Sequence, residues 1–190
     1  MGAPVADDGA AKAAELTAGL DAPDAKVRAL YKFAVTEIKS GGNSTPSHTL
    51  ADMEGDPTEL LAALLKAAGI SFQYAWCRGP SPNYPEYDVE MSLPMYGTEL
   101  LLVNLPTGDV WLWPWRWNAF GALPNQIYGG EALVVGGGTA FFRALPSRTP
   151  EERAVATRIE VKIDENAMAD IKGALILQLG TAAAAREASS

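Results

Sequence analysis

Apolar residues recur at helical spacing in two segments of the N-terminal half. Residues 24–38 and residues 56–68 each place their apolar side chains on one face of a helix. The first face consists of Val27, Leu30, Tyr31, Ala34 and Ile38, and the second of Leu60, Leu61, Leu64, Leu65 and Ala68. Each pattern predicts an amphipathic helix that packs on a core. A shorter helix is expected near residues 11–20.

The second of these helices has recognisable end signals. Asp56 is a favourable N-cap, and Pro57 suits the first helical position. Glu59 follows Asp56 at the spacing of a capping box. Gly69 ends the pattern, as expected of a residue that adopts positive φ after a helix. The sequence therefore predicts a helix that starts after Asp56 and stops before Gly69.

The rest of the chain favours strands, because apolar and polar residues alternate or form short apolar runs between turn residues. Residues 40–47 are expected to form a polar loop and residues 79–98 a long one. The predicted strands cover residues 70–78, 100–105, 110–113, 132–135, 139–144, 154–163 and 171–179, with turns at 106–109 and 136–138. Helices thus come first along the chain, and antiparallel hairpins follow.

Charge and hydropathy restrict the partners. The chain has 190 residues and a formal net charge of −8, which argues against a nucleic-acid backbone or an anionic membrane as partner. It contains no run of about 18 apolar residues, so no membrane insertion is expected. The first residues do not resemble a signal peptide. The sequence therefore predicts a cytoplasmic protein as given, or a periplasmic or exported one if the chain is a fragment.

Chemistry that depends on cysteine, histidine or metal ions has little support in the sequence. Cys77 is the one cysteine and His48 the one histidine, so an internal disulfide is excluded and a cysteine-based zinc site is not expected. Asp52, Glu54 and Asp56 alternate along the chain, but the rest of a calcium-loop motif is missing. We therefore predict no metal site and no cofactor.

The segment Gly55-Asp-Pro57 opens its helix as Gly-Asp-Cys opens the nucleophile helix of transglutaminase-like enzymes. Val110-Trp-Leu-Trp-Pro114 is similar to the Trp-Leu-Asp-Pro strand of the same enzymes. Further similar stretches, in the same order along the chain, are residues 24–38, 70–78, 120–124 and 130–135. Together they resemble the transglutaminase-like superfamily, and in particular bacterial exported members with β-rich domains around the core.

The resemblance implies an α+β fold with a papain-like core, in which N-terminal helices pack on an antiparallel sheet. Residues 23–130 would form this core, and residues 1–22 would be an N-terminal extension or linker. Residues 131–190 would begin a C-terminal β-rich domain that is incomplete in this chain. The strands of this incomplete segment are open, so self-association through them is expected.

The same resemblance implies that the Cys-His-Asp triad of the family is replaced. The cysteine position falls on Pro57, the histidine position on Glu99 and the aspartate position on Trp113. Shifting the alignment does not restore the triad, because His48 precedes Cys77 whereas the family order is cysteine before histidine. Acyl transfer through a thioester needs a thiolate, a base and its orienting carboxylate. We therefore expect a pseudoenzyme.

Such a pseudoenzyme is expected to bind or scaffold a protein or peptide partner, within a bacterial envelope assembly. The alternative is a cysteine-type acyltransferase or protease-like enzyme of the same fold that uses unconventional residues. Its nucleophile would be Cys77 or Thr58.

Tryptophans at every second position form the strongest positive signal for a binding site. If residues 111–117 were extended, all four rings would share one face, although Pro114 interrupts a strand. The rings would then either fill the hollow of a lost active site or form an apolar groove for a peptide, a glycan or an aromatic side chain of a partner. The candidate groove residues are Trp111, Trp113, Trp115 and Trp117.

Overall fold

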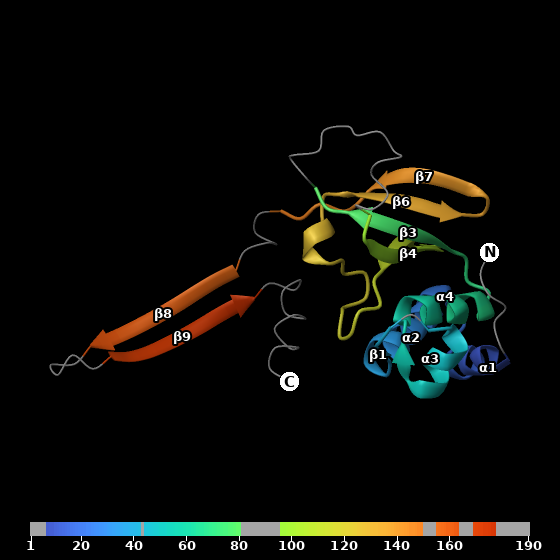
Figure 1. Ribbon diagram of the computed structural model, residues 1–190, viewed down its shortest axis with the longest axis horizontal. Coiled ribbons are helices and arrows are strands. Elements are labelled where there is room, and N and C mark those ends of the chain that lie inside the picture. Colours follow the sequence, from blue (N-terminus) through green and yellow to red (C-terminus); the bar gives the residue numbers. More distant parts are fainter. Residues whose placement is uncertain (1–6, 43, 81–95, 150–154, 164–168, 178–190) are drawn as a thin grey trace. The chain divides into compact units, whose positions relative to one another are not determined.

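Helices occupy the first third of the chain, and strands follow (Figure 1). The computed structural model describes residues 7–42, 44–80, 96–149, 155–163 and 169–177. The helices are α1 (Asp7–Leu16), α2 (Pro23–Thr36), α3 (Pro46–Asp52) and α4 (Pro57–Ala67). The strands are β1 (Lys39–Ser40), β2 (Glu54–Gly55), β3 (Phe72–Arg78), β4 (Thr98–Leu105), β5 (Gly108–Leu112), β6 (Glu131–Gly136), β7 (Thr139–Ala144), β8 (Val155–Ile163) and β9 (Ala169–Leu177). The predicted α+β class is confirmed.

Two units divide the chain, residues 1–146 and residues 147–190. The first unit contains an antiparallel sheet with the strand order β5-β4-β3-β6-β7. The expected boundary at residue 130 differs from this division, because β6 pairs with β3 in the centre of the sheet and β7 pairs with β6. These two strands complete the core sheet and do not begin a second domain. The second unit contains β8 and β9, which pair antiparallel along their whole length.

The helices pack on one face of the sheet and form the first core with it. This core includes Leu30 of α2, Leu64 of α4 and Leu101 of β4, all inaccessible to solvent. The expected extension or linker at residues 1–22 differs from the structure. Within it, α1 packs against α4, and its Ala13 is buried in the first core. Among the described residues, no helix is long and apolar enough to cross a membrane.

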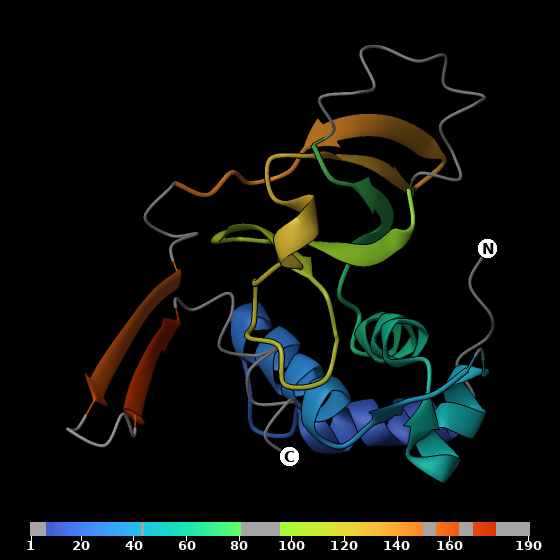
Figure 2. The same ribbon diagram turned by 60° about the vertical axis from the view of Figure 1, so that its left-hand side comes forward.

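A second core lies on the opposite face of the sheet. It is formed by Ala75, Cys77, Leu100, Leu102, Trp111, Leu123, Ile127, Ala132, Val134 and Leu145. The two outer strands approach each other over this face, because Arg143 Nη1 of β7 lies 2.6 Å from Asp109 Oδ2 of β5. The sheet therefore curls around the second core (Figure 2).

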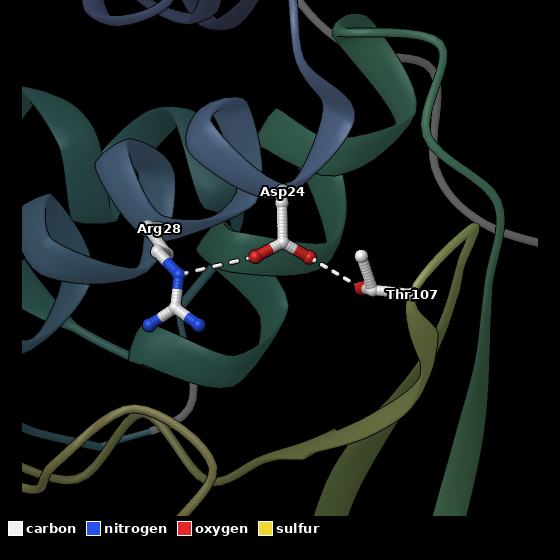
Figure 3. Close-up of polar contacts among 3 residues, drawn as sticks. All are labelled: Asp24, Arg28 and Thr107. Carbon is white, nitrogen blue, oxygen red and sulfur yellow. Dashed lines mark hydrogen bonds and ion pairs between the residues drawn. The ribbon is translucent and has the colours of Figure 1, made fainter.

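One polar contact joins the helical layer to the far end of the β4–β5 hairpin. Asp24, in the first turn of α2, accepts a hydrogen bond from Thr107 Oγ1 at 2.9 Å and pairs with Arg28 Nε at 3.2 Å (Figure 3). The Arg28 guanidinium also lies 4.1 Å from the ring centroid of Phe120. α2 is thereby tied to two loops of the strand region.

The predicted helix start at Asp56 is confirmed, but its capping box is only half formed. Asp56 Oδ1 accepts hydrogen bonds from the backbone N–H groups of Thr58 (2.8 Å) and Glu59 (3.2 Å). The Glu59 side chain does not return to Asp56 N; instead, Glu59 Oε2 accepts a hydrogen bond from Tyr74 Oη at 3.2 Å. The buried Thr49 Oγ1 accepts from Asp56 N at 3.3 Å. At the other end, Gly69 has the expected positive φ of 71°.

The short helix α3 was not predicted, and it begins within the last residues of the loop expected at residues 40–47. Thr45 caps it by accepting from His48 N, and Pro46 takes the first helical position. These two residues are a recognised start signal. The helix has only seven residues, which is too short for apolar periodicity to reveal it.

Candidate functional site

A pocket of about 520 Å³ lies where the start of α4 meets the start of β4 and the end of β5. Its lining residues are Ser40, Gly41, Gly42, Gly55, Asp56, Pro57, Thr58, Gly97, Thr98, Glu99, Trp113, Pro114 and Trp115. We call it the first pocket. Pro57, Glu99 and Trp113, which are far apart in the sequence, all line it. The structure thus brings together the three positions that the sequence resemblance assigns to the replaced triad.

Pro57 is buried and occupies the first position of α4. A proline has no side-chain nucleophile and no backbone N–H to offer a ligand. The two N–H groups that follow in the helix are taken by Asp56. The N-terminal end of α4 therefore faces the pocket with backbone N–H groups that already have a hydrogen-bond acceptor, and it carries no thiol that these groups could activate.

Backbone contacts fix the approach to α4. Gly55 has a φ of 150°, and a Cβ at this position would collide with Ser44 Oγ and Thr49 Oγ1. Only glycine fits here without strain. Ser44 and Thr49 hydrogen-bond to each other through their hydroxyl groups, so a small polar network packs behind Gly55, which lines the first pocket.

Glu99 stands on β4, directly across from Trp76 of β3. Burial raises the pKa of its carboxyl group, and the negative charges of Glu59 and then Asp56 raise it further. Among the described residues, no side chain or backbone group is seen to hydrogen-bond or ion-pair with the Glu99 carboxyl group. Its half-buried carboxyl group therefore faces the first pocket with an electrostatic cost that no cation of the described chain offsets.

Trp113 is held in place through its backbone. Its carbonyl oxygen accepts hydrogen bonds from Tyr31 Oη of α2 at 2.9 Å and from Asn118 Nδ2 at 3.2 Å. Its ring stacks on Trp115, with centroids 5.5 Å apart and an interplanar angle of 9°. The Trp115 ring is 45% exposed. The two indoles form a flat apolar wall on the first pocket.

The four candidate groove tryptophans do not form one row. β5 ends at Leu112, and the chain then turns at Pro114. Trp111 is 7% exposed and belongs to the second core. Trp117 has a φ of 62° and contacts Arg116, and its ring is 42% exposed. Of the four, only Trp113 and Trp115 line the first pocket.

The two residues with the most familiar catalytic chemistry lie elsewhere. Cys77 is 1% exposed in the second core, and burial raises the pKa of its thiol to about 12. His48 is exposed on α3. Neither side chain lines the first pocket. Thr58, the other candidate nucleophile, does line it, two positions after the helix cap.

A second pocket of about 540 Å³ lies between α4 and β3, and sequence reasoning did not find it. Its wall is the aromatic series Phe72, Tyr74 and Trp76, which alternates along β3 and is half-buried. Tyr74 and Trp76 stack with centroids 6.1 Å apart. Glu99 lines both pockets. The alternation of these aromatic residues in the sequence could have indicated that they share one face of the strand, but it does not tell how exposed that face is.

The described residues contain no group of three or more His, Cys, Asp or Glu side chains placed to hold a metal ion. The first pocket offers two carboxylates, those of Asp56 and Glu99, and one of them is engaged as a helix cap. The chemistry available to the pocket is therefore stacking on indole rings combined with electrostatic attraction of positive charge.

No protein-family model matches the sequence, and no curated protein matches it. A crystal structure of a candidate protease from Parabacteroides distasonis resembles the chain with a TM-score of 0.53 at 13% sequence identity. The match covers 82% of this chain and 34% of the other, so the chain spans about a third of that protein's length. At this identity the likeness concerns the fold, and it agrees with the α+β architecture described above.

Proposed function

We propose that the protein is a catalytically inactive member of the transglutaminase-like superfamily that binds a protein or peptide in the first pocket. The observation that carries this proposal is the lining of that pocket. Pro57, Glu99 and Trp113 surround it, and together they supply neither a thiolate nor an imidazole base. Both groups are needed for thioester chemistry of the papain type.

The shape of the first pocket supports binding. The stacked Trp113–Trp115 pair gives an exposed apolar surface on a backbone that Tyr31 holds in position. Aromatic side chains on a rigid support contribute large contact area with little loss of side-chain entropy. A ligand that covers Trp115 would bury a ring that is otherwise nearly half exposed.

The binding role is tested by screening an array of blocked peptides for ligands of the purified protein and then measuring the hits with two tryptophan variants. Trp115→Ala is expected to abolish binding, because it removes the outer ring of the pocket wall. Trp117→Ala is the matched control, since its ring is about equally exposed but lines no part of the pocket. Binding at this pocket would be contradicted if both variants lost peptide binding equally, or if neither variant lost it.

The rival function is an enzyme that uses Cys77 or Thr58. It is tested by treating the folded protein with a thiol reagent and with a hydroxyl-directed acylating probe at neutral pH. We expect negligible labelling of Cys77, because burial raises the pKa of its thiol to about 12 and shields the sulfur. We expect none of Thr58. Stoichiometric labelling of either residue, with loss of a hydrolytic activity in Cys77→Ser or Thr58→Ala, would overturn the proposed function.

A further inference from the structure

The first and second pockets adjoin at Glu99. This residue lines both of them, with the Trp113–Trp115 stack in one and the Tyr74–Trp76 stack in the other. Because Trp76 and Glu99 are directly opposed on neighbouring antiparallel strands, their side chains stand next to each other on the same face of the sheet. One carboxyl group is therefore flanked by two aromatic walls.

The charge around this carboxyl group is negative. Asp56, Glu59 and Glu99 line the two pockets, and among the described lining residues Lys66 is the one with a cationic side chain. Lys66 lies in the last turn of α4, roughly two helical turns beyond Glu59. Lys66 therefore lines the second pocket from the C-terminal end of α4, and none of the described residues that line the first pocket is cationic.

The negative charges also oppose one another. Burial and the neighbouring carboxylates of Glu59 and Asp56 raise the pKa of Glu99. A bound cation would relieve this repulsion, whereas a neutral ligand would leave it in place. The indole faces on either side attract a cation as well, because the aromatic quadrupole is negative on the face of the ring.

We infer that the two adjoining pockets together bind an extended peptide segment in which an arginine or lysine side chain is flanked by apolar residues. The basic side chain lies against Glu99, and the apolar neighbours cover the two aromatic walls. This inference rests on the proposed binding function and specifies the chemistry of the ligand. Each pocket has a volume larger than about 500 Å³. Their combined volume is therefore larger than the volume of one basic side chain, so neighbouring residues of the peptide have room to bind as well.

The test is calorimetric titration of the full chain with three blocked peptides of the pattern Leu-X-Leu, in which X is arginine, citrulline or glutamate. Citrulline preserves the shape of arginine but carries no charge. We expect the arginine peptide to bind at least about tenfold more tightly than the citrulline peptide, as is usual when a partly buried charge pair is lost. The glutamate peptide is expected not to bind.

Variants assign the preference to Glu99. Glu99→Gln is expected to remove the advantage of the arginine peptide and to leave the citrulline peptide unaffected. The matched control is Glu37→Gln, which changes the net charge equally at the exposed C-cap of α2, outside both pockets. Trp115→Ala is a second variant at an exposed position, and it is expected to abolish binding of both peptides.

Each outcome separates this inference from the function on which it rests. Four results would overturn the assignment of a basic ligand. The arginine and citrulline peptides could bind equally, or neither could bind. A neutral oligosaccharide such as maltohexaose could bind more tightly than the arginine peptide, or the two Glu→Gln variants could have equal effects. None of these results would restore a nucleophile to the first pocket. The labelling of Cys77 or Thr58 described above would overturn the binding module itself and is measured separately.

Discussion

The two faces of the central sheet differ in how they treat polar and reactive groups. On the face opposite the helices, the sheet curls around a closed core that contains the one thiol of the chain. On the helical face, the region beside the start of α4 stays open, and the exposed Trp115, the half-buried Trp113 and like-charged carboxylates line it. The helical face also carries the first core, so both faces stabilise the fold. The open region beside the start of α4 differs, because it holds the carboxyl group of Glu99, whose charged form is disfavoured there. Such an arrangement is typical of a surface kept for a ligand.

The largest expected effect breaks the closed face. Leu102→Ala removes a side chain that is inaccessible to solvent in the second core. It should lower the free energy of unfolding by about 2–5 kcal/mol, since it deletes buried methyl groups and leaves a cavity. Urea denaturation followed by circular dichroism measures the change. A loss below about 1 kcal/mol would show that this core is loosely packed.

The next largest effect on stability is expected at the helix cap Asp56, which lines the first pocket. Asp56→Ala removes the acceptor of two helix N–H groups and should cost about 0.5–2 kcal/mol of folding stability. Asp56→Asn keeps an acceptor at the same position and serves as the control. If both variants lost the same stability in thermal unfolding, the charge and not the cap would be responsible.

A smaller effect, of opposite sign, is expected at Glu99. Its pKa is raised in the folded state, so the folded protein holds this proton more tightly than the unfolded chain does. The contribution of Glu99 to stability therefore decreases as the pH rises through its folded pKa. Glu99→Gln should be more stable than the wild type at pH 7 and should lose that advantage near pH 4. Thermal melts at the two pH values would refute this if the difference did not change with pH.

The smallest effect on stability is expected for Trp115→Ala. The ring is 45% exposed and stacks on one neighbour, so its loss should change the free energy of unfolding by less than about 1 kcal/mol. Ligand binding, by contrast, should be abolished. A stability loss as large as that of Leu102→Ala would mean that the Trp113–Trp115 stack also supports the fold.

Local patterns in the sequence were sufficient for most of the elements. The strand predicted at residues 139–144 agrees with β7, and the cap at Asp56 and the stop at Gly69 are both present. These features depend on neighbouring residues alone. Long-range pairing was harder to predict, since nothing in residues 131–136 indicates that β6 lies beside β3. The domain boundary was therefore expected too early in the chain.

The candidate site shows the same limit. The family resemblance led to three positions that line one pocket, Pro57, Glu99 and Trp113. The row of four tryptophans failed because the period-two argument needs a continuous strand, and the chain turns at Pro114. The pocket beside Tyr74 and Trp76 depends on the spacing between α4 and β3, which no local pattern encodes.

One hydroxyl group has a consequence for how the protein is made. Tyr31 Oη donates to the carbonyl oxygen of Trp113, a residue 82 positions later in the chain. During synthesis the helices emerge well before this tryptophan does, so the contact that fixes the wall of the first pocket can form only after the helical segment has left the ribosome. A nascent chain arrested after α4 would therefore lack Glu99, Trp113 and Trp115, which line the first pocket.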